Sequence, residues 1–68
     1  MSYEQKTLLL VLAQRGWTVS LVPKSDLVQV HNFDLCYRFA WDSINLRPVL
    51  VQTVDQRGNV ILEVVQVG

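Results

Sequence analysis

The nine residues FDLCYRFAW, at positions 33–41, alternate without interruption between large apolar side chains and polar or small ones. Because successive side chains of a β-strand point to opposite faces of a sheet, the alternation predicts a strand here. Its large apolar residues would then share one face: Phe33, Leu35, Tyr37, Phe39 and Trp41. This row constrains the register of its neighbours, since a slip of one residue would move it to the other face.

A helix is predicted before this strand, over residues 3–15. Ser2 and Gln5 have the spacing of a capping box, in which each side chain satisfies a free amide at the helix start. Gly16 suits a helix end. The apolar run at positions 8–13 extends most of the way round the helix. A helix of that kind is expected to be covered on more than one side.

Alternating segments at 17–21 and 27–31 predict two strands joined through the turn residues 23–26, with Val19 opposite Val30 and Leu21 opposite Val28. A tight turn at 32–33 would set Val30 opposite Leu35 and His31 opposite Asp34.

The remaining turns are expected at 42–45 and 55–58. The first would set Tyr37 opposite Leu50, and the second, a type I turn with a bulge, Val54 opposite Val60. The predicted fold class is α+β: one N-terminal helix packed on a five-stranded antiparallel meander sheet, forming a single domain over residues 1–68.

These registers collect the apolar residues of all five strands on one face, which the helix would cover. Val54 belongs to that set, with Gln52 and Gln66 as its polar exceptions. The opposite face would gather a second apolar cluster rimmed by charges, which is typical of an interface. Its predicted partner-binding residues are Cys36, Arg38, Arg47, Val49, Val51, Ile61, Glu63 and Val65, with Val67 beside them and Asp34 and Thr53 at the rim.

Composition limits the possible functions. Six basic and six acidic residues give zero net charge, so the electrostatic signature of a nucleic-acid or membrane binder is missing. One cysteine excludes an internal disulfide and favours a reducing, cytoplasmic setting. No signal-peptide pattern is found, and the longest apolar run is too short to span a bilayer.

Candidate chemistry is sparse. His31, Asp34 and Cys36 could form a nucleophile with its base, and a thiol enzyme would make Cys36 react quickly with a mild alkylating agent. However, no glycine-rich loop accompanies them, and a His31–Asp34 surface pair is the simpler expectation. One His and one Cys are too few for a zinc site, and no phosphate-binding loop is found. We therefore expect no enzyme activity, no metal and no cofactor.

The sequence predicts a small non-enzymatic protein–protein interaction module, such as an adaptor, inhibitor or assembly factor. Self-association to a homodimer is expected, through the apolar face or through a long apolar edge strand at 60–67. The alternative is a single-stranded nucleic-acid binder of Sm-like architecture, an analogy of element order alone. That alternative requires Arg38 and Arg47 to approach each other diagonally across neighbouring strands.

Overall fold

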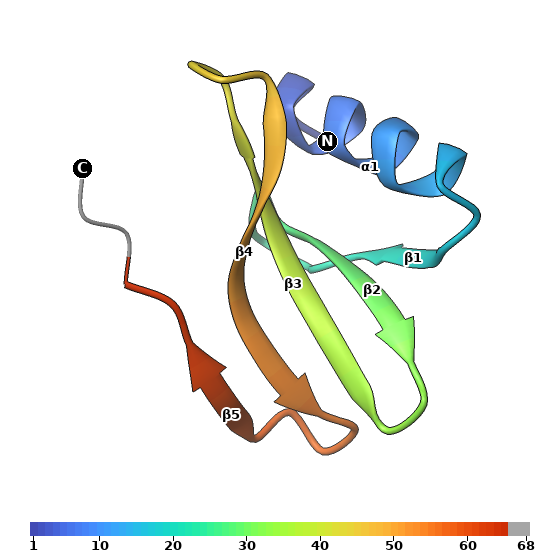
Figure 1. Cartoon of the computed structure of the whole chain (residues 1–68), viewed down its shortest axis with the longest axis vertical. Helices are drawn as coiled ribbons and strands as arrows, with labels where there is room; N and C mark the ends of the chain where they lie inside the picture. Colours follow the sequence, from blue (N-terminus) through green and yellow to red (C-terminus); the bar gives the residue numbers. More distant parts are fainter. Residues whose placement is uncertain (66–68) are drawn as a thin grey trace.

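The structure is a computed structural model and describes residues 1–65 of the chain. One helix precedes a five-stranded antiparallel sheet in which the strands follow one another in sequence order (Figure 1). The predicted α+β fold with a meander sheet is therefore confirmed. The elements are α1 (Tyr3–Gln14), β1 (Thr18–Leu21), β2 (Val28–Asn32), β3 (Leu35–Asp42), β4 (Arg47–Asp55) and β5 (Val60–Glu63).

Helix α1 begins as predicted and ends one residue early. The Ser2 hydroxyl accepts a hydrogen bond from the Gln5 amide at 3.1 Å, and Gly16 follows the helix with a φ of +80°. The Gln5 side chain does not complete the capping box. It is buried, and its Nε2 donates to the Leu27 carbonyl at 2.9 Å, joining the helix to the β1–β2 loop.

The first hairpin has the predicted register, with Val19 opposite Val30 and Leu21 opposite Val28. The second turn is displaced by one residue, to Phe33 and Asp34, so the predicted pairing of Val30 with Leu35 is wrong. Val30 instead lies opposite Tyr37. Phe33 takes a left-handed φ of +52° at the turn and is 94% exposed, and it therefore does not join the aromatic row.

The β3–β4 loop is displaced by one residue from the predicted turn, to residues 43–46, so that Leu46 belongs to it, with a φ of +54°. Asp42 organises this loop: its Oδ1 accepts hydrogen bonds from the amides of Ile44 and Asn45 at 3.0 and 3.2 Å. The register shifts as a result, so that Phe39, rather than Tyr37, lies opposite Leu50.

Two irregularities in β4 and β5 change which side chains face the helix. A register shift leaves Val51 without an opposite residue, and a second shift does the same for Ile61. Beyond the first, Thr53 lies opposite Tyr37 on the helix-covered face, whereas Gln52 and Val54 lie opposite Arg38 and Cys36. The predicted faces of Gln52, Thr53 and Val54 are therefore wrong, since one extra residue reverses the alternation after it.

The last turn is as predicted. Gly58 donates from its amide to the Asp55 carbonyl at 3.0 Å and has a φ of +87°, which suits a type I turn followed by a bulge. Val54 lies opposite Val60, as expected. Strand β5 is shorter than the predicted edge strand, and the predictions for Gln66 and Val67 lie outside the described residues.

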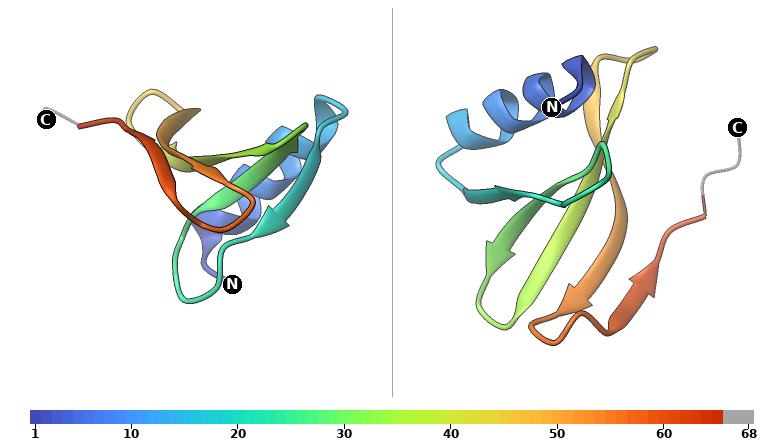
Figure 2. Two further views of the ribbon diagram at one scale, coloured as in Figure 1. Left: turned by 90° about the horizontal axis from the view of Figure 1, so that it is seen from below. Right: turned by 180° about the vertical axis from the view of Figure 1, so that it is seen from behind.

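The core lies between α1 and one face of the sheet. Leu8 and Leu12 of the helix are fully buried against Val28 and Val30, and the partly buried rings of β3 pack around them. Contrary to the sequence-based expectation, α1 is covered on one side only among the described residues, and Leu10 is exposed. Figure 2 shows that the sheet is strongly twisted and that β5 lies at the edge remote from the helix.

Candidate partner-binding site

The sheet face opposite α1, which we call the open face, is crossed by a continuous row of polar residues. The strand registers set one member on each strand, each opposite the next. We call this row the polar ladder: Ser20, Gln29, Arg38, Gln52 and Glu63. The predicted apolar cluster is therefore interrupted at the middle of the face, and Gln52 reaches the ladder only because of the extra residue in β4.

Hydrogen bonds connect the ladder from one edge of the sheet to the other. Gln29 Nε2 donates to the Ser20 hydroxyl at 3.1 Å. Arg38 donates in both directions, from Nε to Gln29 Oε1 at 3.3 Å and from a terminal nitrogen to Gln52 Oε1 at 2.9 Å. Gln52 Nε2 then donates to the Glu63 carboxylate at 3.2 Å. The two glutamines thus hold the guanidinium in a fixed orientation.

Arg38 has no carboxylate partner within residues 1–65, the part of the chain that the structure describes. The ion pair found there joins Arg47 to Asp42, with 3.8 Å between Nε and Oδ2. Arg47 lies opposite Asp42, near the far end of β3, so the expected approach of Arg38 and Arg47 is wrong. Arg38 therefore presents a half-buried positive charge at the centre of the open face.

A second row on the open face brings a thiol and an imidazole together. Cys36 lies opposite His31, which corrects the predicted pairing of His31 with Asp34. The Cys36 sulfur is 3.3 Å from His31 Nδ1, and His31 Nε2 is 2.7 Å from the Ser20 hydroxyl. Because Ser20 also belongs to the polar ladder, the thiol is connected to the ladder through the imidazole.

A shallow pocket of about 340 Å³ opens between these two rows and the β4–β5 turn. Its lining includes Cys36, His31, Gln29 and Arg38, with buried Val54 and the turn residue Asp55 on the other side. A thiol, an imidazole and a guanidinium therefore share one solvent-accessible space.

The predicted partner-binding residues fall into two groups: five lie on the open face, and three lie at the register shifts or beyond β5. Cys36, Arg38, Arg47, Val49 and Glu63 occupy open-face positions in the register. Val51 and Ile61 are the extra residues at the register shifts, and Val65 is exposed beyond the end of β5.

The prediction missed Ser20, Gln29 and Gln52. Ser20 and Gln29 alternate with apolar neighbours, a signal that could have placed them on the open face, whereas Gln52 gave no such signal because it reaches this face only through the extra residue in β4.

The outer edge of β5 is the most apolar exposed segment of the described chain. Val60, Ile61 and Leu62 follow one another and are 51%, 57% and 51% exposed. Within residues 1–65, β4 is the only element that β5 contacts. Unpaired edges of this kind are ready to pair with another strand.

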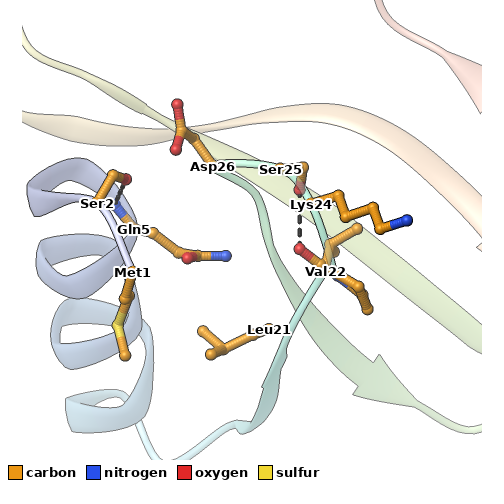
Figure 3. A pocket seen from close by; sticks show the side chains of 9 residues that line it. Met1, Ser2, Gln5, Leu21, Val22, Lys24, Ser25 and Asp26 are labelled. Carbon is orange, nitrogen blue, oxygen red and sulfur yellow. Dashed lines mark hydrogen bonds between the residues drawn. The ribbon is translucent and has the colours of Figure 1, made fainter.

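Two further pockets lie on the helix side of the sheet. The one in Figure 3, about 490 Å³, is bounded by the start of α1 and the β1–β2 loop. Gln5 extends across it toward the loop, while Lys24 and Asp26 point away from its centre. The other, about 480 Å³, lies beyond the end of α1, where the rings of Trp17 and Phe39 stack with centroids 6.3 Å apart. Neither contains a cluster of reactive groups.

Two carboxylates in the turns have a lowered pKa. At Asp42 the main cause is the hydrogen bond from the Asn45 side chain, and amide hydrogen bonds and Arg47 add to it. At Asp55 the pKa is lowered chiefly by the backbone amide of Asn59, followed by its side chain. Both carboxylates accept hydrogen bonds from groups of their own turns, so they stabilise the turns rather than form a reactive centre.

The described residues contain no group of three or more metal-ligating side chains and no helix long and apolar enough to cross a membrane. Comparisons of the chain with protein-family models, with characterised proteins and with solved structures gave no match.

Proposed function

We propose that this chain is a small, non-enzymatic protein–protein interaction module that acts as a homodimer, with the two copies joined along the outer edge of β5. The observation that carries the proposal is the run of three half-exposed apolar residues, Val60 to Leu62, on a strand with one neighbour. A second copy would cover these side chains and pair the free backbone of the edge.

The backbone geometry of β5 supports edge pairing. The Val64 amide donates to the Val51 carbonyl at 3.0 Å, which makes Gln52 and Glu63 a pair of the non-hydrogen-bonded type. The backbone N–H and C=O of Glu63 therefore point away from β4. Antiparallel pairing of β5 with β5 of a second copy would satisfy such groups symmetrically.

The polar ladder favours an edge interface over face packing. Two apolar layers pressed together over the open face would remove Arg38 from water without a carboxylate to compensate its charge. Burial of an uncompensated charge costs several kcal/mol. An edge interface leaves Arg38 and the rest of the ladder hydrated, and the open face of each copy remains available.

The small core also supports association. The fully buried large side chains of the described residues are Leu8, Leu12, Val28 and Val54, whereas twelve large apolar residues are exposed. A chain of this length rarely gains enough stability from its own core. Covering the β5 edge would bury apolar side chains that are half-exposed in the monomer.

The proposal is tested by light scattering coupled to gel filtration on matched isoleucine variants. The Ile61→Lys change puts a charge on the β5 edge, and the Ile44→Lys change puts the same charge on the β3–β4 loop, where Ile44 is 88% exposed. Wild type and the Ile44→Lys variant should elute as particles of twice 7.8 kDa at micromolar concentration. The Ile61→Lys variant should elute as a folded monomer.

A wild-type protein that stays monomeric at these concentrations would refute the dimer. A dimer that survives Ile61→Lys but not Ile44→Lys would move the interface away from β5. The nucleic-acid alternative is checked on the same samples by a gel shift with single-stranded RNA at low salt, where a basic surface would bind most strongly. Because Arg38 and Arg47 lie apart and net charge is zero, we expect no shift.

A further inference from the structure

The open-face pocket combines three groups whose chemistry fits one class of reactant. We propose that Cys36 is a reactive thiol that exchanges with small disulfides carrying carboxylate groups, and that Arg38 selects for their negative charge. This modification is stoichiometric and does not depend on the dimer, since Cys36 lies on β3 and the proposed interface lies on β5.

The thiol and its base are in place. With 3.3 Å between the Cys36 sulfur and His31 Nδ1, the imidazole can take the thiol proton directly. The Ser20 hydroxyl, 2.7 Å from Nε2, holds the ring in this orientation. A nucleophile, a base within hydrogen-bond reach and a third group that orients the base form the arrangement that activates thiols in proteins.

The position of Arg38 supports the proposal independently of the thiol. Arg38 lies two residues from Cys36 on the same strand face, about 7 Å away along β3, and both line the pocket. Its guanidinium is held by two neutral glutamine oxygens, and no carboxylate of residues 1–65 pairs with it. A guanidinium in a fixed orientation without a carboxylate suits a planar anionic group from outside.

The two carboxylates nearest to Arg38 and the pocket already accept hydrogen bonds from other groups of the protein. Asp55 also lines the pocket, but its Oδ1 accepts hydrogen bonds from the amides of Arg57 and Asn59, both at 2.9 Å. Its Oδ2 accepts from the Asn59 side chain at 3.1 Å. The Glu63 carboxylate, at the end of the ladder, is bound by Gln52. Among the described residues that line the pocket, Arg38 is the one side chain with a permanent positive charge, and the Asp55 carboxylate is held by its own turn.

The exchange needs no oxidant, reductant or other reactant besides the small disulfide. His31 takes the proton of Cys36, and the thiolate attacks one sulfur of the small disulfide. A bond forms between that sulfur and Cys36 while the original sulfur–sulfur bond breaks. The departing thiolate recovers the proton from His31 and leaves as a free thiol. Cys36 is oxidised to a mixed disulfide, and half of the reactant is reduced.

The test compares two disulfides of opposite charge. Glutathione disulfide carries carboxylates, and cystamine carries ammonium groups. Each reacts with the folded protein, and intact-mass spectrometry follows the mixed disulfide over time. Rates are divided by those of N-acetylcysteine amide, a neutral model thiol. Relative to this standard, the protein should prefer glutathione disulfide over cystamine by about fivefold, the order expected for two unit charges about 4 Å apart in water.

Variants assign the roles of the two side chains. The Arg38→Gln change should remove the preference for the anionic disulfide, whereas Arg38→Lys, which keeps the charge, should retain most of it. Arg47→Gln is the matched control, because Arg47 lies outside the pocket. The His31→Gln change should slow both reactions by about tenfold or more, because the base is removed. Circular dichroism confirms that each variant is folded.

Three results would overturn the proposal: normalised rates that do not favour the anionic disulfide, a preference unchanged by Arg38→Gln, or a rate unchanged by His31→Gln. If Arg38→Gln fails to fold, the Arg38→Lys variant is used to decide whether Arg38 selects the anionic disulfide. A loss of reactivity to both reagents in that variant would indicate a structural role for Arg38 and contradict anion selection.

Discussion

Arg38 differs from the other charged residues of this chain in how it is held. Asp42, Asp55 and Arg47 act at turns, where local backbone amides or a neighbouring charge account for them. Arg38 donates to two glutamines on neighbouring strands and so connects β2, β3 and β4 through side chains alone. The same contacts that order the open face therefore orient the charge that we assign to ligand selection.

The two turn aspartates predict how stability depends on pH. Their pKa lies below the ordinary value of 3.8, so the unfolded chain binds protons more readily at these sites than the folded chain does. Their stabilising effect is present above that value and is lost as pH falls through the lowered pKa. Thermal unfolding should therefore show a midpoint that is nearly constant between about pH 6 and pH 5 and falls below about pH 4.

Asparagine variants separate these sites from the other carboxylates. In a variant carrying Asp42→Asn and Asp55→Asn, the amide oxygens can still accept from the backbone amides of the turns, the bonds from the Asn45 and Asn59 side chains are lost, and neither side chain titrates. The acid-induced fall of the midpoint should be smaller in this variant. Asp26→Asn, in the β1–β2 loop, is the matched control and should leave the fall unchanged. A double variant with the wild-type pH profile would contradict the assignment.

At the scale of elements, the sequence predicts the helix, the five strands and their order correctly, because alternation and turn residues are local signals. The register across β3 and β4 is not local. The extra residue Val51 leaves the apolar pattern of β4 intact while turning Gln52 and Val54 toward the open face. A run of residues that suit either face gives no sequence signal for such a shift.

Two turn residues also take conformations that could not be predicted from the sequence. Phe33 and Leu46 both take left-handed backbone conformations at exposed positions, where glycine or asparagine would be expected. Asn32 and Asn45 each stand one residue before these positions, so the residue pattern did not indicate that the turns would be displaced by one residue. The Cys36–His31 contact depends on that displacement, and it could not be predicted for the same reason.

The attachment of α1 to the sheet predicts a clear difference between two glutamines of the helix. Gln5 is 5% exposed and donates to the Leu27 carbonyl, whereas Gln14 is exposed at the helix end. Gln5→Leu would leave that carbonyl without its donor, at a cost of about 1–3 kcal/mol. Gln14→Leu should change the free energy of unfolding by less than about 0.5 kcal/mol. Urea titration of both variants measures the difference, and equal effects would refute the attachment role.

At the scale of the whole molecule, the two sheet edges are not equivalent. Helix α1 packs against β1 to β4 but does not contact β5 within the described residues. The chain thus covers one end of its sheet and exposes apolar residues at the other. A dimer through β5 would place two sheets side by side as one continuous sheet, with both open faces and both Cys36 pockets accessible.

The most direct test of the dimer is nuclear magnetic resonance on an equal mixture of isotope-labelled and unlabelled protein, with selection of contacts between different copies. We predict intermolecular contacts involving the methyl groups of Val60, Ile61 and Leu62 on β5. Intermolecular contacts confined to the turns around Phe33 and Ile44, or no intermolecular contacts at all, would contradict association through the β5 edge.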